Sequence, residues 1–156
     1  MRNLFIEKIY NLCDGKKAEE VFLTYIKSDG TQDDITYRSF GLKCELLMQK
    51  FQKSILHRKD RVLLLTPMSP FGCIAVTALA ISELVSVVLN PQLPEEELDS
   101  LVIKSDISGI VCDEEIYQKY AYKWTQKYPV FNIKTGDLFH DKKYFSEPSK
   151  DRDDDV

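Results

Sequence analysis

Short apolar segments alternate with longer amphipathic ones between residues 60 and 133, and this alternation restricts the possible folds more than any other feature. The apolar segments are brief and rich in β-branched residues, as is typical of strands. We predict strands at 61–66, 85–89, 109–112 and 130–133, and helices at about 70–83, 94–104 and 113–127. Strands that alternate with helices form βαβ units, which build a parallel sheet with helices on both faces. The predicted fold class is therefore α/β, with a doubly wound, mostly parallel sheet.

A β-hairpin and a helix are predicted ahead of this sheet. Residues 21–26 favour a strand, residues 28–31 (Ser-Asp-Gly-Thr) form a strong turn signal, and residues 35–37 favour the returning strand. A helix at about 37–53 follows, with Thr36 as its N-cap. Its predicted buried face carries four side chains at helical spacing, namely Phe40, Cys44, Leu47 and Phe51.

The length of 156 residues suits a single domain. Phe5, Ile9 and Leu12 lie at helical spacing and predict a short amphipathic helix, which with a linker makes up residues 1–19. The predicted α/β unit spans residues 20–138. Residues 139–156 form a polar tail with a charged end, which on its own is typical of a disordered terminus.

Charge and hydropathy exclude several classes of protein. The chain has 21 basic and 25 acidic residues, so the basic face that nucleic-acid binding requires is not expected. Residues 62–82 carry no charge and are long enough to cross a bilayer. Because Pro67, Pro70 and Gly72 interrupt this stretch, a strand, a loop and a buried helix explain it better than a membrane span. We expect a cytoplasmic protein.

The cysteine spacing points to buried thiols. No two of the four cysteines are closer than about 29 residues, so no C-x-x-C metal or redox pair occurs. The only possible bases for a nucleophilic cysteine are His57 and His140, and neither stands in a recognisable arrangement. We therefore predict free, reduced thiols in apolar surroundings for the whole set: Cys13, Cys44, Cys73 and Cys112.

Ligands of open α/β sheets bind beyond the carboxyl ends of the strands. The loops expected there are 66–71, 90–94, 112–115 and 133–137. The first contains prolines, which lack an N–H group, and no loop has the glycines and lysine of a P-loop or a G-x-G-x-x-G motif. The sequence therefore offers no candidate cofactor-binding residue.

Acidic side chains cluster where two helices are expected to begin. Glu95–Glu97 and Asp113–Glu115 lie at helix starts, where negative charge stabilises the positive end of the helix dipole. A phospho-acceptor role for Asp113 is an alternative, but it requires acidic partners after the first core strand, which ends in Leu65 and Thr66.

Trp124 and its tyrosine neighbours are expected to pack on the sheet. No catalytic or metal-binding residue is predicted.

Six segments, in this order and spacing, match a known pattern. The sequence Ile-Thr-Tyr-Arg-Ser-Phe resembles "T-Y-x-x-L", and Lys59–Leu65 resembles "k-G-D-r-V-x-l". The remaining segments resemble "l-P-N-S-p-e-f", "A-x-x-x-a-G-x-v-x-v-P-l-n-P", "l-p-x-e-E-L" and "d-S-g-a-k-v-v". In order, the six are 35–40, 59–65, 66–71, 78–91, 93–98 and 105–111. The residues 153–156 (Asp-Asp-Asp-Val) also resemble the "x-D-D-v-A" that precedes a phosphate-binding loop.

Together these segments resemble the N-terminal part of the adenylate-forming, AMP-binding enzymes, which include acyl-CoA synthetases and fatty acyl-AMP ligases. The resemblance implies that residues 20–138 form the N-terminal α/β subdomain of an AMP-binding domain. The family uses ATP and Mg to convert a carboxylate into an acyl-adenylate. Three departures are Lys59, where the family usually has Gly, Met68, where it has Asn, and the region of Glu83, where its Gly is absent.

The family's ATP-binding and catalytic motifs do not occur in these 156 residues. Missing are the loop "T-S-G-[ST]-T-G-x-P-K-G", the "Y-G-x-T-E" and "T-G-D" segments and the C-terminal lysine, so no site residue can be assigned. We expect this truncated subdomain to bind neither ATP nor Mg and to be inactive alone. Its expected partner is the remainder of the ligase in trans, or a second copy. An autonomous flavodoxin-like binding or regulatory domain, and one half of a split ligase, remain alternatives.

Overall fold

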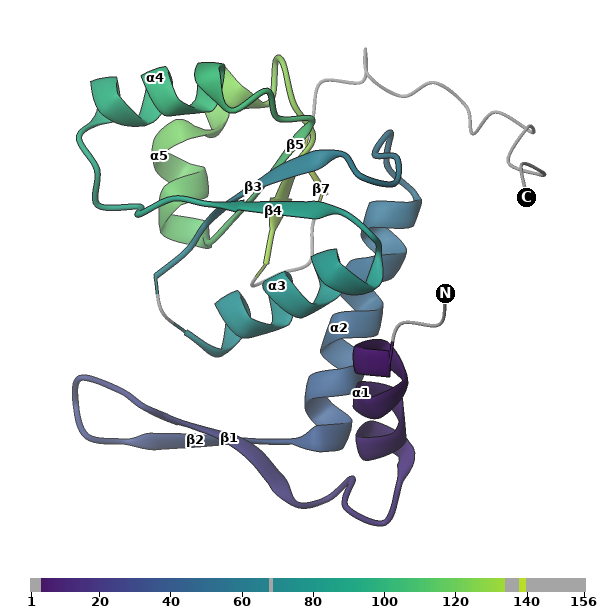
Figure 1. Cartoon of the computed structure of the whole chain (residues 1–156). Helices are drawn as coiled ribbons and strands as arrows, with labels where there is room; N and C mark the ends of the chain where they lie inside the picture. The colour runs from purple at the N-terminus through teal and green to yellow at the C-terminus, as the bar shows by residue number, and fades with distance from the viewer. Residues whose placement is uncertain (1–3, 68, 134–137, 140–156) are drawn as a thin grey trace, which may run out of the picture.

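A computed structural model describes residues 4–67, 69–133 and 138–139. Met68, His140 and all of the predicted tail except residue 139 lie outside the described residues. The described chain has two parts: an N-terminal helix and hairpin, and a five-stranded sheet between two pairs of helices (Figure 1). The predicted α/β class is confirmed.

The elements that precede the sheet in the chain follow the prediction closely. Helix α1 covers Leu4–Asp14, strands β1 and β2 cover Val21–Ile26 and Gln32–Thr36, and helix α2 covers Tyr37–Gln52. The hairpin turn contains Gly30 at φ 81°, a conformation that glycine adopts without steric cost. The predicted cap of α2 is confirmed, because the Thr36 hydroxyl accepts a hydrogen bond from the Ser39 N–H.

The sheet has the strand order β4-β3-β5-β6-β7, and its first four strands are parallel. These strands are β3 (Arg61–Leu65), β4 (Val85–Val88), β5 (Gly109–Cys112) and β6 (Val130–Asn132). Strand β7 (Leu138–Phe139) pairs antiparallel with β6, as Val130 opposite Phe139 shows. The sequence prediction placed residue 139 at the start of the polar tail, because two residues show no periodicity that indicates a strand.

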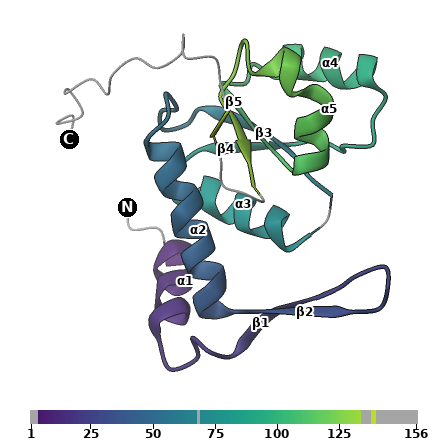
Figure 2. The same cartoon turned by 180° about the vertical axis from the view of Figure 1, so that it is seen from behind.

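The alternation of side chains along β3 divides the core into two apolar clusters. Val62 and Leu64 pack with α2 and with α3 (Pro70–Ile81) on one face of the sheet. Leu63 and Leu65 pack on the other face, against α4 (Glu95–Lys104) and α5 (Glu114–Trp124). All four side chains are at most 2% exposed. The view from behind shows α2 and α3 side by side, with α4 and α5 across the sheet (Figure 2).

Helix α3 is the uncharged segment that the sequence predicted to be buried. It packs beside α2 and against the sheet, and Ala75, Ala78 and Leu79 are fully buried. Within the described ranges, no helix has the length and apolar character needed to cross a membrane.

The four cysteines are free thiols, and three of them are buried, as predicted; Cys73 is partly exposed. Burial raises the pKa of the Cys44 thiol to about 12. Burial also raises the pKa of Cys112 to about 12, with a further contribution from the nearby charges of Asp113 and Glu114. These thiols stay protonated near neutral pH, which fits packing rather than nucleophilic chemistry.

Candidate functional site

The connections that leave β3 and β5 diverge at the carboxyl edge of the sheet. The helix after β3 lies on one face and the helix after β5 on the other, so the chain diverges between residues 66–67 and 112–113. This is the topological switch point of the sheet, where open α/β folds bind ligands. Two cavities lie there.

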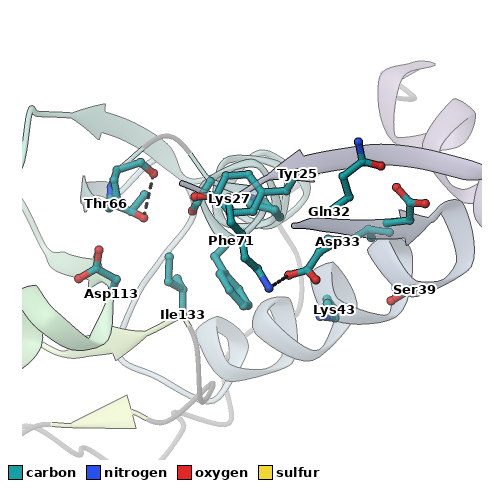
Figure 3. Close-up of a pocket in the computed structure, with 15 residues that line it drawn as sticks. Tyr25, Lys27, Gln32, Asp33, Ser39, Lys43, Thr66, Phe71, Asp113 and Ile133 are labelled. Atoms are coloured by element: carbon teal, nitrogen blue, oxygen red, sulfur yellow. Dashed lines mark hydrogen bonds and ion pairs between the residues drawn. The ribbon is translucent and has the colours of Figure 1, made fainter. Parts of the chain in front are cut away.

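The first cavity lies between the hairpin and the carboxyl edge and has a volume of about 560 Å³ (Figure 3). Its apolar wall includes Ile35 from β2, Phe71 from the start of α3, and Ile133 directly after β6. Thr66 and Asp113 line it from the two loops of the switch point. The volume is within the range of small-molecule sites.

The second cavity has a volume of about 570 Å³ and lies on the other side of the switch point. It shares Thr66, Pro67 and Asp113 with the first. Its further wall is the loop after β4, in which the Asn90 side chain accepts a hydrogen bond from the Gln92 N–H. The structure thus brings together three of the four predicted loops and Ile133 from the fourth. Residues 134–137 lie outside the described residues.

Asp113 stabilises the start of α5, as the sequence predicted. Its Oδ1 accepts a hydrogen bond of 2.9 Å from the Ile116 N–H. The neighbouring Glu114 accepts a hydrogen bond from the side chain of Asn132, which is completely buried at the end of β6. The end of β3 supplies no acidic partner for Asp113, because it ends in Leu64 and Leu65 and is followed by Thr66 and Pro67. A phospho-acceptor site is not supported.

The charges on the hairpin side of the first cavity are mostly paired. Lys27 forms an ion pair of 2.7 Å with Asp33, seen as a dashed line in Figure 3. Asp34 accepts a hydrogen bond of 2.6 Å from the Thr24 hydroxyl. The Lys43 ammonium lies 5.6 Å from the centre of the Phe71 ring, a cation–π contact at the cavity wall.

The start of α3 offers few free N–H donors to a ligand. The Ser69 hydroxyl caps α3 by accepting the Gly72 N–H at 3.3 Å, so that donor is already used. Pro70, the first residue of the helix, has no N–H group to offer a phosphate. In the described ranges no three His, Cys, Asp or Glu side chains are grouped closely enough to hold a metal ion.

The predicted packing of Trp124 in the core is confirmed, and His57 lies on the surface. His57 is exposed, and its N–H donates to the Asp60 carboxylate at 2.8 Å. Trp124 and Tyr120 are 3% and 1% exposed and stack on each other within the core, so they form no ligand platform. His140 lies outside the described residues.

The contribution of the hairpin to the first cavity was not predicted from the sequence. Tyr25, Lys27, Ile35 and Lys43 line it from β1, β2 and α2. The available signal was the apolar alternation of the hairpin, which indicates one covered face. It does not say which part of the fold that face covers.

A sequence model described as "AMP-binding enzyme" matches residues 13–154. A search of curated protein sequences found no significant match. The family match thus covers most of the chain, including the sheet, the hairpin and both cavities.

Several solved structures share the fold. A fatty acid AMP ligase from Legionella pneumophila has a TM-score of 0.73 at 16% identity, over 88% of this chain and 25% of that chain. The NpsA N-terminal subdomain from Klebsiella oxytoca, in complex with 3-hydroxyanthranilyl-AMSN, has a TM-score of 0.63 at 22% identity, over 83% and 30%. The o-succinylbenzoate CoA synthetase MenE from Bacillus subtilis has a TM-score of 0.65 at 13% identity, over 81% and 24%. The match spans 24–30% of the length of these proteins.

Proposed function

The chain belongs to the AMP-binding enzyme family, and we propose that it forms the N-terminal subdomain of an ATP-dependent ligase that makes acyl-adenylates. The family match over residues 13–154 is the observation that carries the proposal. The acid is proposed only as an acyl or related carboxylate. We also propose that the protein is located in the cytoplasm, because four free thiols suit a reducing compartment.

We propose that the 156-residue chain is catalytically inactive by itself and binds neither ATP nor Mg. The support is the chemistry at the carboxyl edge. The loop after β3 has proline where a phosphate cradle needs N–H donors, and the sequence lacks the Gly/Ser/Thr-rich loop of the family. In this proposal the chain supplies scaffold, and a further part of the ligase supplies the reacting groups.

The proposed partner is that further part, which covers apolar side chains left exposed on this unit. Leu42 and Leu46 lie one turn apart on α2 and are 55% and 61% exposed. Val76 on α3 is 42% exposed and Val88 on the edge strand β4 is 64% exposed. Exposed apolar groups at several places on two adjacent helices and a sheet edge are typical of a surface that packs on another domain.

The test of inactivity is ATP–pyrophosphate exchange with the purified 156-residue chain and a panel of fatty and aromatic acids. A complete acyl-AMP ligase of the family, assayed in parallel, controls for the acids and the label. We expect no exchange above background. Exchange that depends on both acid and ATP would show that these residues contain a complete active site, and would overturn the proposal.

The origin of the missing groups is tested by sequencing the transcript beyond the codon for Val156. A reading frame that continues into a Gly/Ser/Thr-rich loop would place the reacting groups on the same polypeptide. A stop codon with no such loop downstream would favour the split ligase. In that case the chain should co-purify with a protein that carries the loop and the C-terminal lysine, and the pair together should restore exchange.

A second candidate function is an autonomous binding domain, and the two cavities at the switch point favour it. An autonomous domain covers its own apolar surface. Strong binding of a hydrophobic dye at neutral pH by the folded chain would therefore count against this candidate and for a missing partner.

A further inference from the structure

No further inference is drawn: the strongest candidate, the cavity of about 560 Å³ between the hairpin and the carboxyl edge of the sheet, belongs to the candidate site already described, and nothing in the structure shows what covers its hairpin side.

Discussion

Among the described residues, three that are not glycine adopt a left-handed backbone conformation that normally favours glycine. Lys59, Glu83 and Asp106 have φ of 69°, 57° and 48°. Each stands two or three residues before a strand, so all three occupy the amino edge of the sheet, opposite the cavities. Lys59 lies where the family resemblance expects glycine, and Glu83 lies near a second such position. At that edge the Lys59 N–H donates to the Glu83 carbonyl at 2.8 Å, which links the two strained turns.

Glycine at these positions should stabilise the fold. A residue with a side chain pays roughly 1–2 kcal/mol for the left-handed backbone conformation, and glycine avoids this cost. Glycine also makes the unfolded chain more flexible, which cancels about 0.4–1 kcal/mol of the gain. We expect Lys59→Gly and Asp106→Gly each to raise the free energy of unfolding by about 0.5–1 kcal/mol, measured by urea denaturation. Lys53→Gly is the control, because Lys53 has an ordinary φ of −84°. It should destabilise, and a gain there as large as at Lys59 would contradict the explanation.

The buried thiols predict how stability depends on pH. The pKa values of Cys44 and Cys112 are raised by burial from 9.0 to about 12. Between these values the folded protein keeps protons that the unfolded chain releases. The stabilising contribution is therefore complete below about pH 9 and is lost as the pH rises toward 12.

The free energy of unfolding should accordingly be lower at about pH 10 than at pH 8. Replacement of both Cys44 and Cys112 by alanine should reduce that difference while lowering stability at both pH values. Cys73→Ala, at the partly exposed cysteine, is the matched control. An unchanged pH dependence in the double variant would show that other groups cause the loss.

At the level of elements, helices α1 and α2 are in contact through a glycine. A Cβ atom on Gly41 would lie 2.5 Å from the Cys13 Sγ and 2.7 Å from the Cys13 Cβ. Alanine is the better helix former by about 1 kcal/mol, but overpacking costs typically about 1–3 kcal/mol. We expect Gly41→Ala to lower the free energy of unfolding and to speed amide exchange in α1. Cys13→Gly in the same chain should restore part of the loss, whereas Leu42→Ala, at an exposed neighbour, should change stability by less than about 0.5 kcal/mol.

The order and type of the elements could be predicted from the sequence wherever the period of apolar residues was long enough to read. Four residues at helical spacing located α2, and β-branched runs located the four parallel strands within about one residue at their ends. Strand β7 was not predicted, because two residues are too few to show the alternation of apolar and polar side chains that indicates a strand. The first cavity could not be predicted for a different reason. Lys43 and Ile133 are separated by 90 residues in the chain, and only tertiary structure brings them to one cavity.

The family motifs predicted the fold better than they predicted a site. Two departures from the motifs, at Lys59 and near Glu83, coincide with positions of left-handed backbone, which the sequence analysis did not predict. The motifs could not indicate a catalytic group, because the segments that match the family lie in a part of the fold made mostly of packed strands and helices. The switch-point cavities follow from topology and not from any residue type.

At the scale of the whole molecule, one sheet serves two cores that do not touch each other except through it. Leu64 belongs to the cluster with α2 and α3, and Leu63, its neighbour in β3, belongs to the cluster with α4 and α5. Because β3 is an interior strand, paired with β4 and β5, damage to either cluster should loosen the strand on which the other depends. The two clusters should therefore unfold together, as small single domains usually do.

This cooperativity can be tested with one natural probe. Trp124 is the single tryptophan and lies in the cluster with α4 and α5. Leu64→Ala opens a cavity in the opposite cluster and should cost about 2–5 kcal/mol. If the molecule is one unit, the midpoint of urea unfolding followed by Trp124 fluorescence falls as far for Leu64→Ala as for Leu63→Ala. It should also coincide with the midpoint from far-ultraviolet circular dichroism. A Trp124 midpoint that responds to Leu63→Ala alone would mean that the faces of the sheet unfold independently, and that the N-terminal helices form a separable layer.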